Sequence, residues 1–216
     1  MKLILSFFDR LDTILRDIQP VGRRLAPEAE QVLARYCFVL ALFEEVYRGE
    51  GLTGRAQNGP LLMPAPKKSV EELLTTPQNA WVDDLCAMSW LFYDQCRQLL
   101  SQPSVLNPMF TGSSDVGGAD ADFIVDQCLV ELKASVQLKI EPEWLWQLAG
   151  YLLLDYVDTY QITSVGIYMA RQGMLFTWPV EEFLHVLTSD TQTSLGGLRQ
   201  EFRSRFSNRP SQHTRK

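Results

Sequence analysis

Histidines and paired cysteines, on which zinc sites and many nucleophilic sites depend, are scarce in this chain. Its 216 residues include two histidines, His185 and His213, and no CxxC pair. The sequence therefore argues against a zinc site, and Ser113 and Ser114 belong to no Ser-His-Asp constellation. We interpret the four cysteines as buried free thiols in a reducing compartment and assign them no chemistry: Cys37, Cys86, Cys96 and Cys128.

The sequence also lacks an apolar run of the length that a membrane span needs. Its longest candidate, around residues 148–154, is soon interrupted by Asp155 and Asp158. The N-terminal stretch MKLILSFFDRLDTILRDI carries a charge every few residues, so it predicts an amphipathic helix and not a signal peptide. We expect a cytoplasmic protein with no membrane partner.

An excess of positive charge, typical of proteins that coat nucleic acid, is missing too. The net charge is -6. Positive charge gathers at the C-terminal end, which could contact phosphate groups or could be a solvated tail. Beside the single acid Glu201, this end holds six basic residues: Arg199, Arg203, Arg205, Arg209, Arg215 and Lys216.

What the chain does have is an ordinary globular composition, 46% hydrophobic and 21% charged. Its first half is typical of helices, with helices expected from Pro27 and over about 79–100. The second half alternates short strand-like runs with helices over about 141–156 and 195–206. We expect a helical region over 1–100 packed on a core over 101–190, then a C-terminal helix and basic tail over 191–216. This order predicts a mixed α/β sandwich.

Two of the strand-like runs, ADADFIVD and CLVELKA, are joined by Asp126 and Gln127. A hairpin with that two-residue turn pairs Val125 with Cys128 and Phe123 with Val130. Extended to the open end, the same register places Asp122 opposite Glu131, and Asp120 opposite Lys133. Because strand side chains alternate, this charged set shares one face, and the apolar set shares the other: Ala121, Phe123, Val125, Cys128, Val130 and Leu132.

Two carboxylates directly opposed on a hairpin, with Cβ atoms roughly 5 Å apart, repel each other. A divalent cation between Asp122 and Glu131 would remove the repulsion, since Mg²⁺ and Mn²⁺ prefer oxygen ligands. Alternatively, the set is the solvated face of an amphipathic hairpin that Lys133 neutralises. The flanking glycines and the helix that follows favour the metal site.

The order of Asp122, an apolar strand and then Glu131-Leu132-Lys133 resembles the D…ExK signature of the PD-(D/E)XK nuclease superfamily. The following WLWQLAGYLLLDY resembles the QxxxY helix of its exonuclease-like branches, with Gln147 and Tyr151 matching. The resemblance covers roughly residues 110–178. It implies a restriction endonuclease-like mixed β-sheet flanked by helices, here with a helical N-terminal extension.

The resemblance implies a role for each matching residue. Asp122 and Glu131 would hold Mg²⁺ or Mn²⁺ with the Leu132 carbonyl, and Lys133 would orient the attacking water and offset phosphate charge. Gln147, one turn before Tyr151, would steady the substrate phosphate. The Pro that often precedes the acid is replaced by Ala121, and Asp120 competes with Asp122.

Some such nucleases complete the site with an acid from an upstream helix, for which Glu44 and Glu45 are candidates. Glutamates near a helix end are more often solvated. Three tryptophans could stack on bases, but we interpret them as packing residues: Trp144, Trp146 and Trp178.

These residues lead to a hypothesis: a metal-dependent nuclease hydrolysing phosphodiester bonds in DNA, by analogy within a restriction or phage-defence system. Its partners would be nucleic acid, DNA before RNA, and a second copy or a defence-system protein. The alternatives are a non-catalytic module that binds nucleic acid or protein, and a structural subunit with an acidic contact face.

Overall fold

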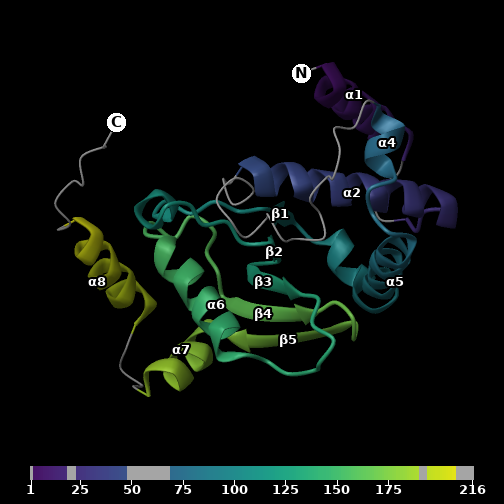
Figure 1. Cartoon of the computed structure of the whole chain (residues 1–216). Coiled ribbons are helices and arrows are strands. Elements are labelled where there is room, and N and C mark those ends of the chain that lie inside the picture. The colour runs from purple at the N-terminus through teal and green to yellow at the C-terminus, as the bar shows by residue number, and fades with distance from the viewer. Residues whose placement is uncertain (1, 19–22, 48–68, 190–193, 208–216) are drawn as a thin grey trace. The chain divides into compact units, whose positions relative to one another are not determined.

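The structure is a computed structural model that describes residues 2–18, 23–47, 69–189 and 194–207 (Figure 1). The chain divides into two compact units, Met1–Tyr93 and Asp94–Lys216. No helix in the described ranges is long and apolar enough to cross a membrane.

The first unit is built from α1 (Lys2–Asp17), α2 (Pro27–Tyr47), α4 (Val70–Leu74) and most of α5 (Asn79–Cys96). The expected amphipathic N-terminal helix is confirmed: Phe7 and Leu11, one turn apart, are its buried residues. One apolar cluster joins α1, α2 and α4: Phe7, Leu11, Tyr36, Val39, Val70 and Leu73.

The second unit contains a five-stranded mixed sheet in the order β1-β2-β3-β4-β5. Pairing is antiparallel except between β3 and β4, which are parallel. The α/β prediction is therefore confirmed at the level of a mixed sheet flanked by helices. The strands are β1 (Ser104–Leu106), β2 (Phe123–Val125), β3 (Cys128–Lys133), β4 (Ser164–Met169) and β5 (Met174–Pro179).

The predicted hairpin register is confirmed by the pairs Phe123–Val130 and Val125–Cys128. Its turn residues Asp126 and Gln127 both have positive φ, 46° and 61°. Two such residues match the type I′ turn, whose twist suits the flanking strands. The sheet thus brings residues 120–122 to the open end of the hairpin.

The parallel pair β3–β4 is connected by α6 (Pro142–Leu154), which lies across one face of the sheet (Figure 1). Leu148 and Leu152 of α6 belong to one cluster with the strand residues Leu129, Val165 and Ile167. Val130 and Tyr168 point to the opposite face and are buried as well. The central strands are therefore covered on both faces, as parallel strands usually are.

Two helices follow β5, namely α7 (Val180–Thr188) and α8 (Leu195–Ser207). The 3₁₀ turns η2 (Arg97–Ser101) and η3 (Ser113–Val116) flank β1. The glycines, prolines and serines of residues 103–118 are typical of turns, but β1 also lies in this stretch and extends the sheet by pairing with β2. Three exposed residues carry too short a pattern to predict such a strand.

Candidate functional site

Glu131 is the most deeply buried member of the predicted site, with 5% of its surface exposed. The alternative of a solvated hairpin face therefore does not hold at Glu131. The crossover helix α6 covers this face, whereas Leu132, expected in the core, is 42% exposed. Because burial disfavours a charged carboxylate, Glu131 needs compensating partners.

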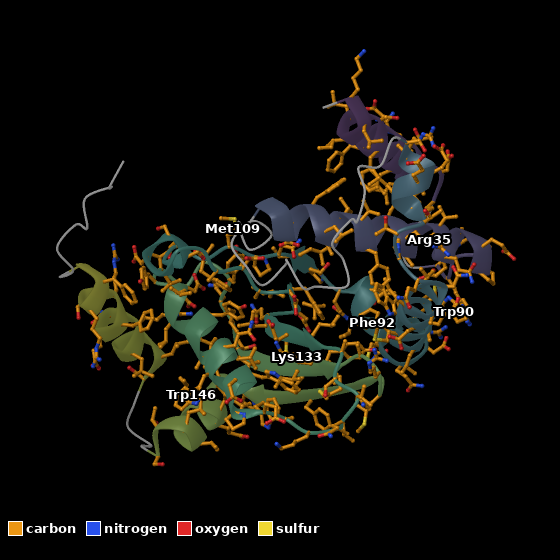
Figure 2. The ribbon with its side chains drawn as sticks, viewed as in Figure 1. Arg35, Trp90, Phe92, Met109, Lys133 and Trp146 are labelled. Atoms are coloured by element: carbon orange, nitrogen blue, oxygen red, sulfur yellow. The ribbon has the colours of Figure 1, made fainter. Side chains whose placement is uncertain are left out.

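One of those partners is Lys133, which ends β3 beside α6 (Figure 2). Its Nζ donates to Glu131 Oε1 at 2.9 Å and to Gln147 Oε1 at 2.8 Å. Gln147 Nε2 in turn donates to the Tyr151 hydroxyl at 2.8 Å. The amide orientation follows from this chain, since an ammonium group can only donate. Strand and helix residues of the two predicted motifs therefore form one hydrogen-bonded chain.

Tyr151 is fixed from its other side by Phe110, whose ring stacks on it at 5.5 Å between centroids. Desolvation raises the pKa of the Tyr151 hydroxyl, and the negative charges of Glu131, Asp122 and Asp120 raise it further. The hydroxyl thus stays neutral at physiological pH. The shared effect indicates that all three carboxylates lie within electrostatic reach of the Tyr151 hydroxyl.

Asp122 approaches β3 by a contact that the hairpin register does not predict. Its Oδ2 accepts a 2.6 Å hydrogen bond from the Leu132 backbone N–H. The β2–β3 ladder ends at Phe123, and Asp122 instead uses its own carbonyl oxygen to accept from Asn107 N. The side chain therefore takes over the backbone donor that the ladder leaves unpaired.

The Leu132 carbonyl lies on the same edge of β3 as this contact. The N–H and C=O of one strand residue point to the same side, and Leu132 N points to Asp122. On the opposite edge, Lys133 O accepts from Ala170 N beyond β4. The proposed third ligand atom therefore faces the carboxylate of Asp122.

Asp120 forms an isolated bridge with Met109 and is half-buried. Asp120 thus lies just beyond the end of the β1–β2 ladder. Its charge acts on Tyr151, as described above, so Asp120 remains next to the site. By position, Asp120 and Asp122 are therefore both candidates for the acid that would hold the metal.

The electrostatics of Glu131 are those of a carboxylate held in an apolar place. Desolvation is the largest effect and raises its pKa above the ordinary 4.5, and the charge of Asp122 raises it further. The hydrogen bond from Lys133 and its positive charge oppose the shift. Glu131 and Asp122 therefore do repel each other, as expected, although no ladder pair joins them.

A divalent cation fits this donor set on one specific observation. Glu131 Oε2 is buried and has no hydrogen-bond partner in the structure. Such an oxygen is costly to bury unless a ligand satisfies it. Among the described residues, however, no group of three or more His, Cys, Asp or Glu side chains could hold a metal. A cation here would therefore rely on two carboxylates, a carbonyl, water and substrate, as Mg²⁺ often does.

The other predicted acids are not part of this cluster's described geometry. Glu44 and Glu45 belong to α2 in the first unit. The side chain of Glu45 lies outside the described residues. Their assignment to the site stays a prediction.

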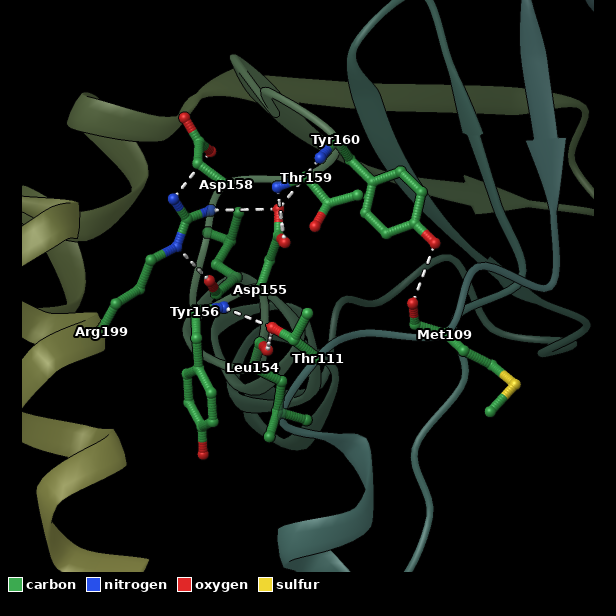
Figure 3. A network of polar contacts seen from close by, with 10 residues as sticks. Met109, Thr111, Leu154, Asp155, Tyr156, Asp158, Thr159, Tyr160 and Arg199 are labelled. Atoms are coloured by element: carbon green, nitrogen blue, oxygen red, sulfur yellow. Dashed lines mark hydrogen bonds and ion pairs between the residues drawn. The ribbon is translucent and has the colours of Figure 1, made fainter. Parts of the chain in front are cut away.

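The basic C-terminal end is only partly as expected, because Arg199 is a buried residue and not a tail residue. It is 6% exposed, donates to the Leu152 carbonyl at 2.8 Å and to Asp158 at 2.7 Å, and pairs with buried Asp155 at 3.5 Å (Figure 3). Arg203 and Arg205 contact the Tyr156 ring and Glu201. The last three basic residues lie outside the described residues: Arg209, Arg215 and Lys216.

Trp144 joins the site although sequence reasoning assigned it to packing alone. Its ring lies over Lys133, with Nζ 5.7 Å from the centroid, within the range of a cation–π contact. The sequence contained an indication of this position, since Trp144, Gln147 and Tyr151 follow the i, i+3, i+7 spacing of one helix face.

Comparison with known proteins finds no family model, no curated protein and no solved structure that matches the chain.

Proposed function

We propose that the second unit is a divalent-metal-dependent nuclease that hydrolyses phosphodiester bonds in DNA, with a site of the PD-(D/E)XK type. One observation carries the proposal: the unpartnered, buried Oε2 of Glu131, held beside the Lys133 ammonium and the Asp122 carboxylate. A buried acid beside a second acid and a lysine, at the spacing of the D…ExK signature, is the arrangement that such hydrolysis needs.

Within this proposal Asp122, Glu131 and the Leu132 carbonyl would hold Mg²⁺ or Mn²⁺. When bound, the ion polarises a phosphoryl oxygen and lowers the pKa of a coordinated water. Lys133, tied to Glu131 and Gln147, would orient the attacking water and offset charge on the phosphate. Gln147 and Tyr151 would hold that ammonium in place from α6.

A second candidate, a module that binds nucleic acid or protein without cleaving it, is favoured by a different observation. The described residues offer two close carboxylates and no third ligand side chain from His, Cys, Asp or Glu. A weak metal site is expected of a protein that retains the fold but no longer catalyses cleavage. The restriction or phage-defence setting stays an analogy with the superfamily that the motifs resemble.

A cleavage panel separates these candidates. Purified full-length protein is incubated with linear duplex, circular duplex and single-stranded DNA in Mg²⁺, in Mn²⁺ and in EDTA. The nuclease proposal expects cleavage with either metal, none in EDTA, and none by Glu131→Gln. The matched control is Glu143→Gln, which removes an exposed charge from the first turn of α6.

Each outcome has one reading. Cleavage that persists in EDTA, or in the Glu131→Gln protein, overturns the proposed site. Metal-independent DNA binding without cleavage by the wild-type protein supports the non-catalytic module instead.

A further inference from the structure

A pocket of about 360 Å³ lies between the start of α6, the end of β5 and α7. Leu145 lines it, and Gln147, two residues on, projects about 200° further around the helix. The pocket is thus on the other side of α6 from the Glu131 cluster and shares no residue with it. Its volume falls within the range of about 300–1,000 Å³ typical of small-molecule sites.

The lining is apolar except for one charged group, Glu182. Trp178 and Phe183 provide aromatic rings whose centroids are 6.5 Å apart. Val186, which is 79% exposed, leaves the pocket reachable from solvent. The six apolar lining residues are Ile140, Leu145, Trp178, Phe183, Val186 and Leu187.

The charge in and around the pocket selects for a cation. Aromatic faces attract positive charge, and Glu182 adds a full negative charge at the same place. No Lys or Arg is among the described residues that line it. The nearest cation in sequence, Lys139, is paired with Glu141 at 2.9 Å. Glu182 would therefore repel an anionic ligand.

We propose that this pocket binds a small organic cation with an apolar body, of the alkylammonium or aralkylammonium class. The apolar body fills the space between Leu145, Phe183 and Leu187, and the ammonium group contacts Glu182 and the Trp178 ring. The site is independent of the proposed nuclease activity. The pocket recognises its ligand by burying hydrocarbon and by forming one ion pair. The cation should therefore bind most tightly, its neutral isostere less tightly and the anion most weakly.

The test is a titration of ¹⁵N-labelled full-length protein with three probes of one shape: 2-phenylethylammonium, 2-phenylethanol and phenylacetate. The chain has five tryptophans, whose indole N–H signals can be followed separately. The Trp178 signal is assigned with Trp178→Phe. We expect saturable shifts at Trp178 and none at Trp146, which is 60% exposed and serves as the control for nonspecific binding (Figure 2).

Two variants then test the charge. Glu182→Gln should weaken phenylethylammonium binding about fivefold, the effect of losing one partly exposed ion pair. It should leave phenylethanol binding unchanged. Glu181→Gln is the matched control, because Glu181 is also exposed in the first turn of α7 but does not line the pocket. It should behave as wild type.

The proposal is overturned by equal affinity for the cation and the alcohol, by an unchanged cation affinity in Glu182→Gln, or by shifts spread over all tryptophans. It is equally overturned if no probe shifts Trp178 saturably. None of these results bears on DNA cleavage, so the two proposals stand or fall separately.

Discussion

The carboxylate of Asp122 accepts a 2.6 Å hydrogen bond from the Leu132 backbone N–H where β2 and β3 stop pairing. This one contact has two consequences. It closes the open end of the hairpin with a side chain, and it holds a negative charge close enough to raise the pKa of Glu131. Asp122 thus stabilises the hairpin by its hydrogen bond and opposes it by its charge.

The first prediction separates these two effects with Asp122→Ala and Asp122→Asn. Asp122→Ala should lower the free energy of unfolding by about 1 kcal/mol, the net worth of one hydrogen bond. Asp122→Asn should lower it less or raise it slightly, because its amide oxygen can still accept from Leu132 and the repulsion with Glu131 is gone. Thermal unfolding in EDTA measures both.

The same two variants test the metal site. Mn²⁺ should raise the melting temperature of the wild-type protein by binding the native state, and EDTA should reverse the rise. Both Asp122 variants should lose most of it, whereas Asp120→Asn should keep it. If the Asp120 variant loses the Mn²⁺ effect and the Asp122 variants keep it, the metal-holding acid is Asp120.

The second prediction concerns Lys133. Lys133→Ala should reduce the rate of DNA cleavage about 10² to 10³-fold, the usual cost of removing one charge stabiliser from such a site. The control is Lys139→Ala, which removes the same charge from an exposed pair with Glu141. Equal cleavage rates in the two variants would show that Lys133 does not act in the site.

The sequence predicted those parts of the site that depend on local geometry. A two-residue turn at Asp126 and Gln127 fixes the register by arithmetic, and the i, i+4 spacing brings Gln147 next to Tyr151. Both are set within a few residues of chain. Neither requires knowledge of what packs above the sheet.

The burial of Glu131 could not be predicted in this way, because it depends on α6 crossing over a face that alternation marked as polar. Arg199 is a similar case. Its partner Asp155 lies in a different part of the sequence, so charge counting grouped Arg199 with the basic C-terminal end, for which phosphate contact and a solvated tail were the alternatives. The burial of both side chains depends on contacts between distant segments, and local sequence patterns do not reveal such contacts.

The third prediction follows from the Arg199 contacts in Figure 3. Arg199→Ala should destabilise the protein by about 3–5 kcal/mol, because it leaves the buried Asp155 carboxylate without its ion-pair partner. Arg205→Ala, which breaks an exposed i,i+4 pair with Glu201, should cost at most about 1 kcal/mol. Urea unfolding of both variants measures the difference, and similar losses would contradict the buried role of Arg199.

The last prediction is a pH dependence that comes from Glu131. Burial raises the pKa of this carboxyl above its ordinary 4.5, so the native state binds its proton more tightly than the unfolded chain does. Protonated Glu131 therefore stabilises the metal-free fold fully below pH 4.5, and this contribution is lost as pH rises through the native pKa. The side chain that Glu131→Gln introduces is neutral at every pH, so this variant cannot lose the contribution.

In EDTA, the melting temperature of Glu131→Gln relative to wild type should rise between pH 4.5 and neutrality. Mn²⁺ at neutral pH should close the gap by stabilising only the wild-type protein, because the ion replaces the proton on Glu131. Melting curves over this pH range provide the measurement, with Glu143→Gln as the exposed control that should follow wild type. A constant difference between Glu131→Gln and wild type across the range would mean that Glu131 titrates as an ordinary solvated acid.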